Sequence, residues 1–540
     1  MIGGVLDTAI ASGKSSAADL SATACCKWAW LVMVAFGVLI LWFTFKDIQD
    51  PLLDRHSHRQ TYTLISVHFM LSEGAWFPHI TPVQGPEWAI PMEFPFYQWA
   101  VAGVVNLTGL SLELAGRLVS LLFWWLVLFE LFRALRHFVP GQLQRTGLVL
   151  MVAAAPTSIY WSRSCLIEAM ALYFSVAFGA RVLSAVTLNR ASDWGWAMLF
   201  GGLAALQKIT TLFVMEVGVG LALLWWCGRR WKSTDTRPIA KKYLCCFLLL
   251  GGWTLAVGAG WAYWADGVKE RNVMAREMTT QAGLRAWNYG TVEQRLAPDT
   301  WKHLASNITL GLSGSTPGMG YKLPLLLWAV SLGLTRRRLA EQGLLVMAFL
   351  SGPLVFLNLY YVHEYYLMAN GYLLLLALGT AVVALWEDPR RRFRQAGWCL
   401  MVLLVAGQLH AYPRYRSLLL AEVPPRRQFE AEFRALLDGR LPPQETLLVY
   451  GHAADSAVAF YARRKAIIDE PNWPPEDVRM QKMLGKLAPD ERIGAMIVAG
   501  ERRTNKMFLR ERIEAFELEE TPKGSFWGDV YFRKQPSSLK

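Results

Sequence analysis

About eleven apolar stretches follow one another between residues 27 and 412, and they restrict the chain to one class of fold. A helix of about 20 apolar residues is needed to cross the roughly 30 Å hydrocarbon core of a bilayer. The chain is also 54% hydrophobic and only 18% charged, a balance that is rare in water-soluble proteins. The sequence therefore predicts a polytopic α-helical membrane protein with spans near 27–45, 112–131, 146–161, 165–187, 194–207, 210–228, 243–264, 321–335, 343–360, 367–386 and 395–412.

Two of these stretches, 194–207 and 321–335, are short, and each is either a full span or a re-entrant or interfacial helix. Basic residues orient the array, because they gather in alternate loops that the positive-inside rule places in the cytoplasm: 133–145, 229–242, 336–338 and 390–394. The loops 46–111 and 265–320 then lie on the outer face. The same basic loops account for much of the net charge of +13, so that charge needs no nucleic-acid partner.

The two ends of the chain differ from the predicted bundle at 27–412. Residues 1–26 are polar and small, which predicts a cytoplasmic tail and not a cleaved signal peptide. Residues 413–540 alternate short apolar runs with charged helical patterns, which predicts a small α/β domain on the outer face, with strands at 447–450, 466–468 and 495–498 and helices at 476–486 and 505–513. This domain lacks a glycine-rich phosphate loop, so we expect it to cap the bundle.

Cysteine usage predicts neither disulfides nor a structural metal. All seven cysteines lie in or beside predicted spans or in the cytoplasmic tail, so no disulfide framework is expected on the outer face. No paired C-x-x-C motif is present, which argues against a structural zinc site.

Three acidic residues at the outer ends of predicted spans are candidates for catalysis. Asp54 is flanked by Arg55 and Arg59, which should lower its pKa and keep it ionised as a general base. The alternative is an ordinary salt bridge at a helix end. Glu93 lies between two prolines and is either a desolvated acid or a cap for the following helix. Glu168 opens a predicted span, where a buried carboxylate is costly and marks a functional site.

Other polar residues gather at the same face. Asp47 and Asp50 compete with Asp54 for the role of base. Lys208, at the outer junction of two predicted spans, suits an anionic phosphate, and its alternative is a lysine that only reaches for the interface. His363 stands with Glu364, Tyr365 and Tyr366 in a short outer turn, where the histidine adds a titratable group to aromatic rings that are common at membrane interfaces.

Several of these motifs occur together in an order that resembles a known family. They are Asp54-x-His56-Ser57-x-Arg59-Gln60-Thr61, the stretch Met70–His79, Glu93-Phe94-Pro95, Ala115-Gly116-Arg117, Tyr160-Trp161-Ser162-Arg163 followed by Glu168, the Lys208 turn, Trp287-Asn288-Tyr289-Gly290 and His363-x-Tyr365-Tyr366. Across residues 30–370 the pattern resembles bacterial GT-C glycosyltransferases of the protein O-mannosyltransferase and lipid A aminoarabinose transferase superfamily.

The resemblance implies transfer of a sugar from a polyprenyl (undecaprenyl) phosphate donor to a glycan, lipid or protein acceptor, lipopolysaccharide among them. The reaction would be an inverting displacement at the periplasmic face of the bacterial inner membrane, with a carboxylate base and cations for the departing phosphate. The implied catalytic residues are Asp54, Glu93 and Glu168. The implied substrate-binding residues are His56, Arg59, Gln60, Arg163, Lys208, His363, Tyr365 and Tyr366. A divalent metal is compatible with this chemistry, but no residue pattern requires one.

Two positions depart from the family's pattern. Arg59-Gln60 stand where relatives carry Asp-Glu, which leaves the choice of base open among Asp54, Glu93 and Glu168. Phe94 replaces a lysine, so Arg59 or Arg163 would have to supply that phosphate-binding cation. The alternative functions are a lipid-linked glycan transporter or flippase and an O-antigen ligase or polymerase. A transporter should show paired internal repeats, and the sequence contains none that we detect.

Overall fold

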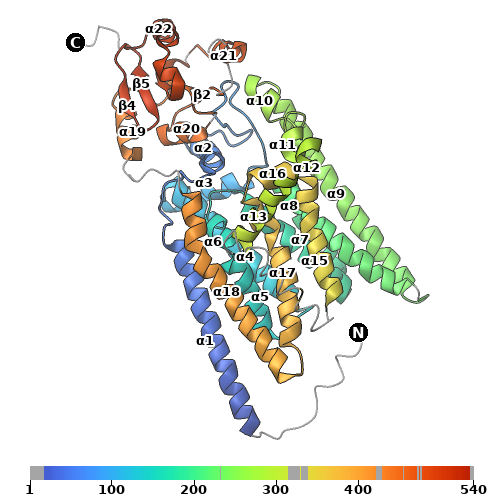
Figure 1. Ribbon diagram of the computed structural model, residues 1–540. Helices are drawn as coiled ribbons and strands as arrows, with labels where there is room; N and C mark the ends of the chain where they lie inside the picture. Colours follow the sequence, from blue (N-terminus) through green and yellow to red (C-terminus); the bar gives the residue numbers. More distant parts are fainter. Residues whose placement is uncertain are drawn as a thin grey trace.

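The computed structural model shows a helical bundle with a smaller α/β domain at one end (Figure 1). It describes residues 17–534 except 232, 314–328, 330–337, 421–428, 454, 471–473, 475–476 and 490, with side chains from residue 27. Within these residues seven helices are long and apolar enough to cross a membrane. They are α1 (Ala17–Phe45), α4 (Leu112–Leu135), α7 (Glu168–Leu188), α8 (Ala191–Arg230), α9 (Arg237–Lys269), α17 (Tyr366–Trp386) and α18 (Arg391–Leu419).

Shorter apolar helices occupy two further predicted spans. The stretch 146–161 forms α5 (Gln142–Ala154) and α6 (Pro156–Trp161), because Pro156 ends the first helix and starts the second. The stretch 343–360 divides into α15 (Leu339–Val355) and α16 (Leu357–Val362), with the break at Phe356. The predicted span 321–335 falls almost wholly outside the described residues, so the count of about eleven spans stays a prediction.

Helix α8 is a helical hairpin. Lys208, near its middle, has a non-helical backbone conformation with φ −167° and ψ 96°. Trp194 and Trp226, which lie near the two ends, both contact the ring of Tyr243 on α9, at centroid distances of 6.0 and 5.7 Å. The two halves therefore run side by side. They match the predicted spans 194–207 and 210–228, and Lys208 lies at the tip of the hairpin.

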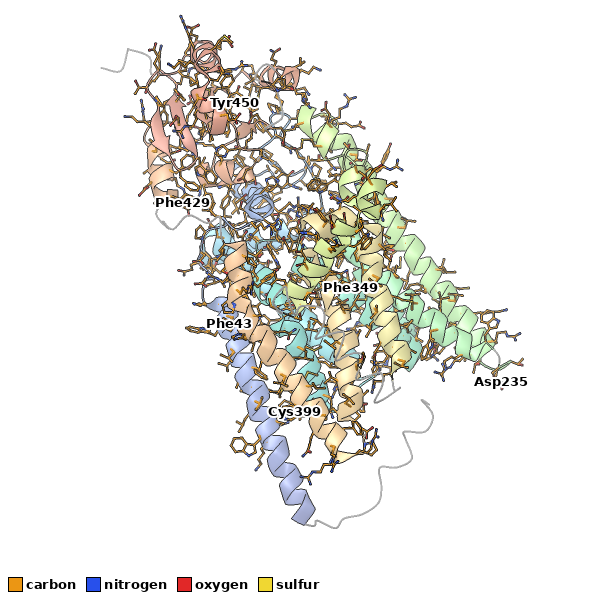
Figure 2. The ribbon with its side chains drawn as sticks, viewed as in Figure 1. Phe43, Asp235, Phe349, Cys399, Phe429 and Tyr450 are labelled. Atoms are coloured by element: carbon orange, nitrogen blue, oxygen red, sulfur yellow. The ribbon has the colours of Figure 1, made fainter. Side chains whose placement is uncertain are left out.

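The bundle has a buried centre, and its two ends differ: one carries a basic loop and the other carries the α/β domain. Helix α17 lies at the centre with nearly all of its side chains buried, whereas α1 and α9 lie at the margin and leave most of theirs exposed. Figure 2 shows Asp235 and Tyr450 at opposite ends of the molecule. Asp235 belongs to the basic loop between α8 and α9, and Tyr450 belongs to the α/β domain. The basic loop 229–242 and the α/β domain are thus at opposite ends.

Short helices form a layer between the bundle and the α/β domain. The segment 46–111 contributes α2 (Ser57–Glu73) and α3 (Phe96–Thr108). The segment 265–320 contributes α10 (Val273–Met278), α11 (Arg285–Tyr289), α12 (Val292–Leu296) and α13 (Pro298–Leu312). Helix α2 packs on the α/β domain, since the hydroxyls of Thr61 and Ser456 lie 2.7 Å apart.

The C-terminal domain contains a five-stranded sheet in the order β2-β1-β3-β5-β4. Strands β1 (Thr446–Tyr450), β2 (Ala466–Ile468) and β3 (Ile493–Val498) are parallel, and β4 (Lys523–Ser525) and β5 (Gly528–Phe532) form an antiparallel hairpin at one edge. Four helices flank them: α19 (Phe429–Asp438), α20 (Ser456–Ala462), α21 (Val478–Leu484) and α22 (Lys506–Ala515), with a short 3₁₀ turn, η1, at Gly500–Thr504. The small α/β domain predicted from the sequence is confirmed.

Residues 79–90 form a connecting segment that contacts both the α/β domain and the segment 265–320. The carbonyl of Pro82 accepts from the backbone N–H of Ala466, and Gln84 bridges to Ile467, so the segment extends the sheet beyond β2. The side chain of Asn272 donates to the carbonyls of Gln84, Gly85 and Glu87. Backbone groups at this sheet edge are thereby satisfied, and the loop 46–111 becomes part of the α/β domain's surface.

The pH dependence of stability should report on this segment through His79. The side chain is 3% exposed, and its removal from water lowers the pKa of His79 to about 4. Between the unfolded pKa near 6.5 and pH 4, the unfolded chain binds a proton that the folded chain excludes. Stability should therefore fall as the pH falls through this window, by at most about 3 kcal/mol. Thermal unfolding of the wild type and His79→Leu between pH 7 and 4 tests this, and an equal pH dependence in both would contradict it.

Candidate active site

Helix α2 brings most of the predicted site residues together at the end of the bundle beneath the α/β domain (Figure 1). Its first turn carries Arg59 and Gln60, whose side chains leave the helix about 100° apart. Arg59 pairs with Glu93, whereas Gln60 bonds Asp54. The site residues accordingly form two groups: the Lys208 cluster (Arg59, Glu93, Glu168, Lys208, Tyr365, Tyr366) and the Asp54 cluster (Asp54, Gln60, Arg117, Tyr160, Arg163).

The Lys208 cluster is built around a buried ion pair at the tip of the α8 hairpin. The ammonium of Lys208 pairs with Oε1 of Glu168, the first residue of α7, and both side chains are buried. The same ammonium lies 4.1 Å from the ring centroid of Tyr366 and 5.4 Å from that of Tyr365. Oε2 of Glu168 is buried without a hydrogen-bond partner. The extended backbone at Lys208 thus places a cation in a desolvated aromatic setting, where electrostatic interactions are strong.

A second ion pair joins this cluster from α2. Arg59 Nη2 lies 3.1 Å from Oε1 of Glu93. Burial alone would lower the pKa of Arg59, but the charge of Glu93, with smaller contributions from Tyr365 and Glu168, raises it. The backbone N–H of Phe94 donates to the carbonyl of Leu206, which holds the Glu93 loop against the Lys208 tip. The alternative role of Glu93 as a cap for the next helix is excluded, because the N-cap of α3 is Pro95 and no side chain caps it.

The turn at 363–366 borders both clusters. His56 Nε2 lies 2.6 Å from Oε2 of Glu364, and Arg55 lies 2.7 Å from Oε1 of the same carboxylate. Burial would raise the pKa of Glu364, but its bond to His56 and the neighbouring charges lower it. The ring of His363 stacks on Tyr365 at 4.9 Å and lies 5.2 Å from His56. Burial, together with the nearby cations, lowers the pKa of His363, so this imidazole is neutral.

The Asp54 cluster holds its carboxylate with neutral donors. Asp54 accepts from the amide of Gln60 at 2.8 and 3.0 Å and from the hydroxyl of Tyr160 at 2.8 Å. Oε1 of Gln60 accepts in turn from the backbone N–H of Cys165, which fixes the amide orientation. Arg55 and Arg59, its neighbours in the sequence, do not pair with this carboxylate as expected, because they pair with Glu364 and Glu93.

Arg163 belongs with Asp54 and not with the Lys208 ion pair. It donates to the carbonyl of Thr44 and lies 5.6 Å from the ring centroid of Tyr160. Of the two arginines expected to replace the missing lysine, Arg59 is therefore the one in the Lys208 cluster. Asp47 and Asp50, the competing acids, both pair with Arg416, at 2.9 and 3.0 Å.

Two side chains of the Asp54 cluster, Arg117 and Tyr160, received no role from the sequence. Tyr160 donates to Asp54, and Arg117 lines the same small pocket. Both occur in motifs that carry the family resemblance. Arg117 is also an ionisable residue inside a predicted span, and that signal alone could have singled it out.

The candidate acids do not converge on a metal site. In the described part of the chain, no three His, Cys, Asp or Glu side chains are placed to hold a metal ion. Asp54, Glu93 and Glu168 each bond a different partner. What the arrangement offers is two cations and two tyrosines at one location and a carboxylate held by neutral donors at the other.

No protein-family model matches the chain, and no curated protein sequence matches it. Solved structures do match. ArnT from Cupriavidus metallidurans bound to undecaprenyl phosphate superposes with a TM-score of 0.60 at 14% identity, covering 93% of this chain and 97% of that one. The archaeal oligosaccharyltransferase AglB from Archaeoglobus fulgidus, in complex with an inhibitory peptide and a dolichol-phosphate, gives 0.53 at 11% identity, covering 95% and 75%. Both are GT-C glycosyltransferases. The chain has the GT-C fold.

A third GT-C structure, the arabinofuranosyltransferase AftD from Mycobacteria, gives a TM-score of 0.51 at 13% identity and covers 94% of this chain and 40% of that one. The first match extends over nearly the full length of both chains. The GT-C fold expected from the ordered motifs is therefore confirmed, including the α/β domain at its end. Identities of 11–14% establish this fold alone, so the roles of individual residues have to come from the geometry of the site.

Proposed function

We propose that this protein is an integral membrane glycosyltransferase that moves a sugar from a polyprenyl phosphate donor to an acceptor at the membrane face beneath the α/β domain. The observation that carries the proposal is the buried Lys208–Glu168 pair with Arg59 and two tyrosines beside it. Ionisable groups are rarely placed in such a desolvated position without a functional reason. Structures of this fold bound to undecaprenyl phosphate and dolichol-phosphate support the choice of a lipid phosphate.

In this proposal the Lys208 cluster binds the donor phosphate. The negative charge on the leaving phosphate grows as the sugar–oxygen bond breaks, and Lys208 and Arg59 stabilise that charge. Glu168 and Glu93 keep both cations positioned and neutralised when no donor is bound. Tyr365 and Tyr366 exclude water from the ammonium and can donate hydroxyl hydrogen bonds to the phosphate.

Asp54 is the proposed general base. Of the three candidate acids it alone lacks an ion-pair partner among the described residues, so a proton from an acceptor hydroxyl need not compete with a bound cation. As the acceptor oxygen attacks the anomeric carbon, its proton passes to Asp54, and the bonding electrons leave with the lipid phosphate. Attack opposite the leaving group inverts the anomeric configuration.

Aromatic rings in contact with one another connect the two clusters. Tyr160, the donor to Asp54, contacts Trp161 with ring centroids 4.8 Å apart, and Trp161 contacts His56 at 5.4 Å. His56 contacts Tyr365 at 5.2 Å, and Tyr365 borders Lys208. We place the donor sugar along this series, between the phosphate at one end and the base at the other.

A transfer assay tests the proposal. The purified protein in lipid nanodiscs would be given radiolabelled undecaprenyl phosphate sugars, one sugar at a time, with extracted cell-envelope glycolipid as acceptor. We expect the label to leave the polyprenyl carrier and to appear on the acceptor with at least one donor. Movement of intact lipid-linked sugar between leaflets, without cleavage of the sugar–phosphate bond, would instead establish a transporter.

A further inference from the structure

The Asp54 cluster lines a small, partly open pocket next to the proposed donor site. Its walls include Asp50, Asp54, Arg117, Tyr160, Arg163 and Ser164. The pocket lies where the end of α1, the start of α4 and the turn after α6 meet, so three separate segments of the chain supply polar side chains to it.

Both arginines of this pocket are buried without an anionic partner. Arg117 is 6% exposed and Arg163 is 7% exposed. Each is seen to donate to one backbone carbonyl, Arg117 to Ile48 and Arg163 to Thr44. Within the described residues no carboxylate lies at ion-pair distance from either guanidinium. A guanidinium carries five N–H donors, so most of the donors on these two side chains are unused by protein acceptors.

The nearest carboxylates do not pair with these two arginines. Asp47 and Asp50 are both engaged by Arg416, and Asp54 is held by the neutral groups of Gln60 and Tyr160. A buried charge is costly unless a partner compensates it, and most buried arginines are paired. Arg117 and Arg163 are thus a pair of cations, and Asp54 a nearby carboxylate, that the protein brings to one pocket without pairing them.

We infer that this pocket binds the acceptor through an anionic group, a phosphate or a carboxylate, carried next to a hydroxyl. Two guanidiniums provide the planar donors that bind such oxyanions in a bidentate manner. Asp54 is then positioned for the neighbouring hydroxyl. The inference rests on the proposed function and narrows it: the acceptor is an acidic or phosphorylated glycan or glycolipid, bound on the side of α2 away from the Lys208 cluster.

A purely structural role for the arginines is the competing explanation, because both bond carbonyls at the end of α1. Such a role would affect the stability of the protein. It would not give the pocket affinity for an anion. The two explanations therefore differ in ligand binding measured on folded variants.

Ligand-observed NMR on the full-length protein in nanodiscs tests the inference with two soluble probes, glycerol 3-phosphate and glucuronate. We expect the wild type to bind at least one probe, and Arg117→Gln and Arg163→Gln each to weaken that binding at least tenfold. The probe that binds identifies the anion as a phosphate or a carboxylate. Arg163→Lys, which keeps the charge but loses the planar fork, should weaken binding less than Arg163→Gln.

Arg464→Gln is the matched control, since Arg464 is a buried arginine of the α/β domain that is paired with Asp438. It should leave probe binding unchanged. Thermal unfolding verifies that each variant is folded. No binding of either probe by the wild type, or equal binding by the arginine variants, would overturn the inference. Probe binding that depends on both arginines, in a protein inactive in the transfer assay, would keep the anion site and reject the proposed function.

Discussion

Replacing Asp54 by asparagine should reduce glycosyl transfer about 10²–10⁴-fold, the usual contribution of a general base, and leave donor binding unchanged. Asparagine keeps the size of the side chain, and its one oxygen, in the place of Oδ2, can still accept from Tyr160 and Gln60. It cannot take a proton from the acceptor. Single-turnover rates with a radiolabelled donor, together with the Kd for undecaprenyl phosphate, separate the chemical step from binding.

Asp47→Asn provides the matched control for this prediction. Asp47 lies in the same outer segment, but its carboxylate pairs with Arg416, which retains Asp50 as a partner. The variant should transfer at nearly the wild-type rate. Undiminished transfer by Asp54→Asn, with a large loss in Glu93→Gln, would contradict the assignment and would indicate that Glu93 is the base.

Replacing Lys208 by methionine should weaken the binding of undecaprenyl phosphate roughly 10–100-fold. A charge-assisted hydrogen bond contributes about 1.5–3 kcal/mol, and 1.4 kcal/mol corresponds to a factor of ten in Kd. The substitution also leaves Glu168 buried beside the donor phosphate without its cation, which adds repulsion to the lost attraction. Binding of a fluorescent undecaprenyl phosphate to the protein in nanodiscs provides the measurement.

Two further variants show whether the effect belongs to the site. Lys208→Met leaves Glu168 buried without its cation and should therefore lower the melting temperature. Adding Glu168→Gln removes that unpaired carboxylate, so the double variant should regain the melting temperature but not the affinity for undecaprenyl phosphate. Lys269→Met removes another buried lysine, which pairs with Asp266 away from the site, and should leave affinity unchanged. Equal donor affinity in Lys208→Met and the wild type would reject Lys208 as a phosphate ligand.

The sequence predicted those features that depend on periodicity and on the cost of burying charge. Apolar runs located α4, α7 and α17, and a lysine at the junction of two predicted spans located the tip of the α8 hairpin. Glu168 was singled out because a carboxylate at the start of a span is costly, and it lies in a buried ion pair with that lysine. Three parallel strands were found because each is a short, fully buried apolar run.

Partners of neighbouring charged residues could not be predicted in the same way. Arg55, Arg59 and Asp54 are close in the sequence, yet the chain turns into α2 at Ser57 and sends their side chains to different neighbours. Those neighbours come from segments far along the chain, such as Glu364. The hairpin of β4 and β5 was missed because β4 is short, largely exposed and contains no apolar alternation. Local pattern gives no information about such long-range choices.

A structure determined experimentally in nanodiscs with undecaprenyl phosphate bound would test the central claim most directly. The account predicts that a phosphate oxygen lies within hydrogen-bond distance, about 3 Å, of Lys208 Nζ, with Arg59 on its other side and the isoprenoid chain leading into the bilayer. A phosphate bound away from these residues, or a continuous water-filled path across the whole bundle, would contradict it.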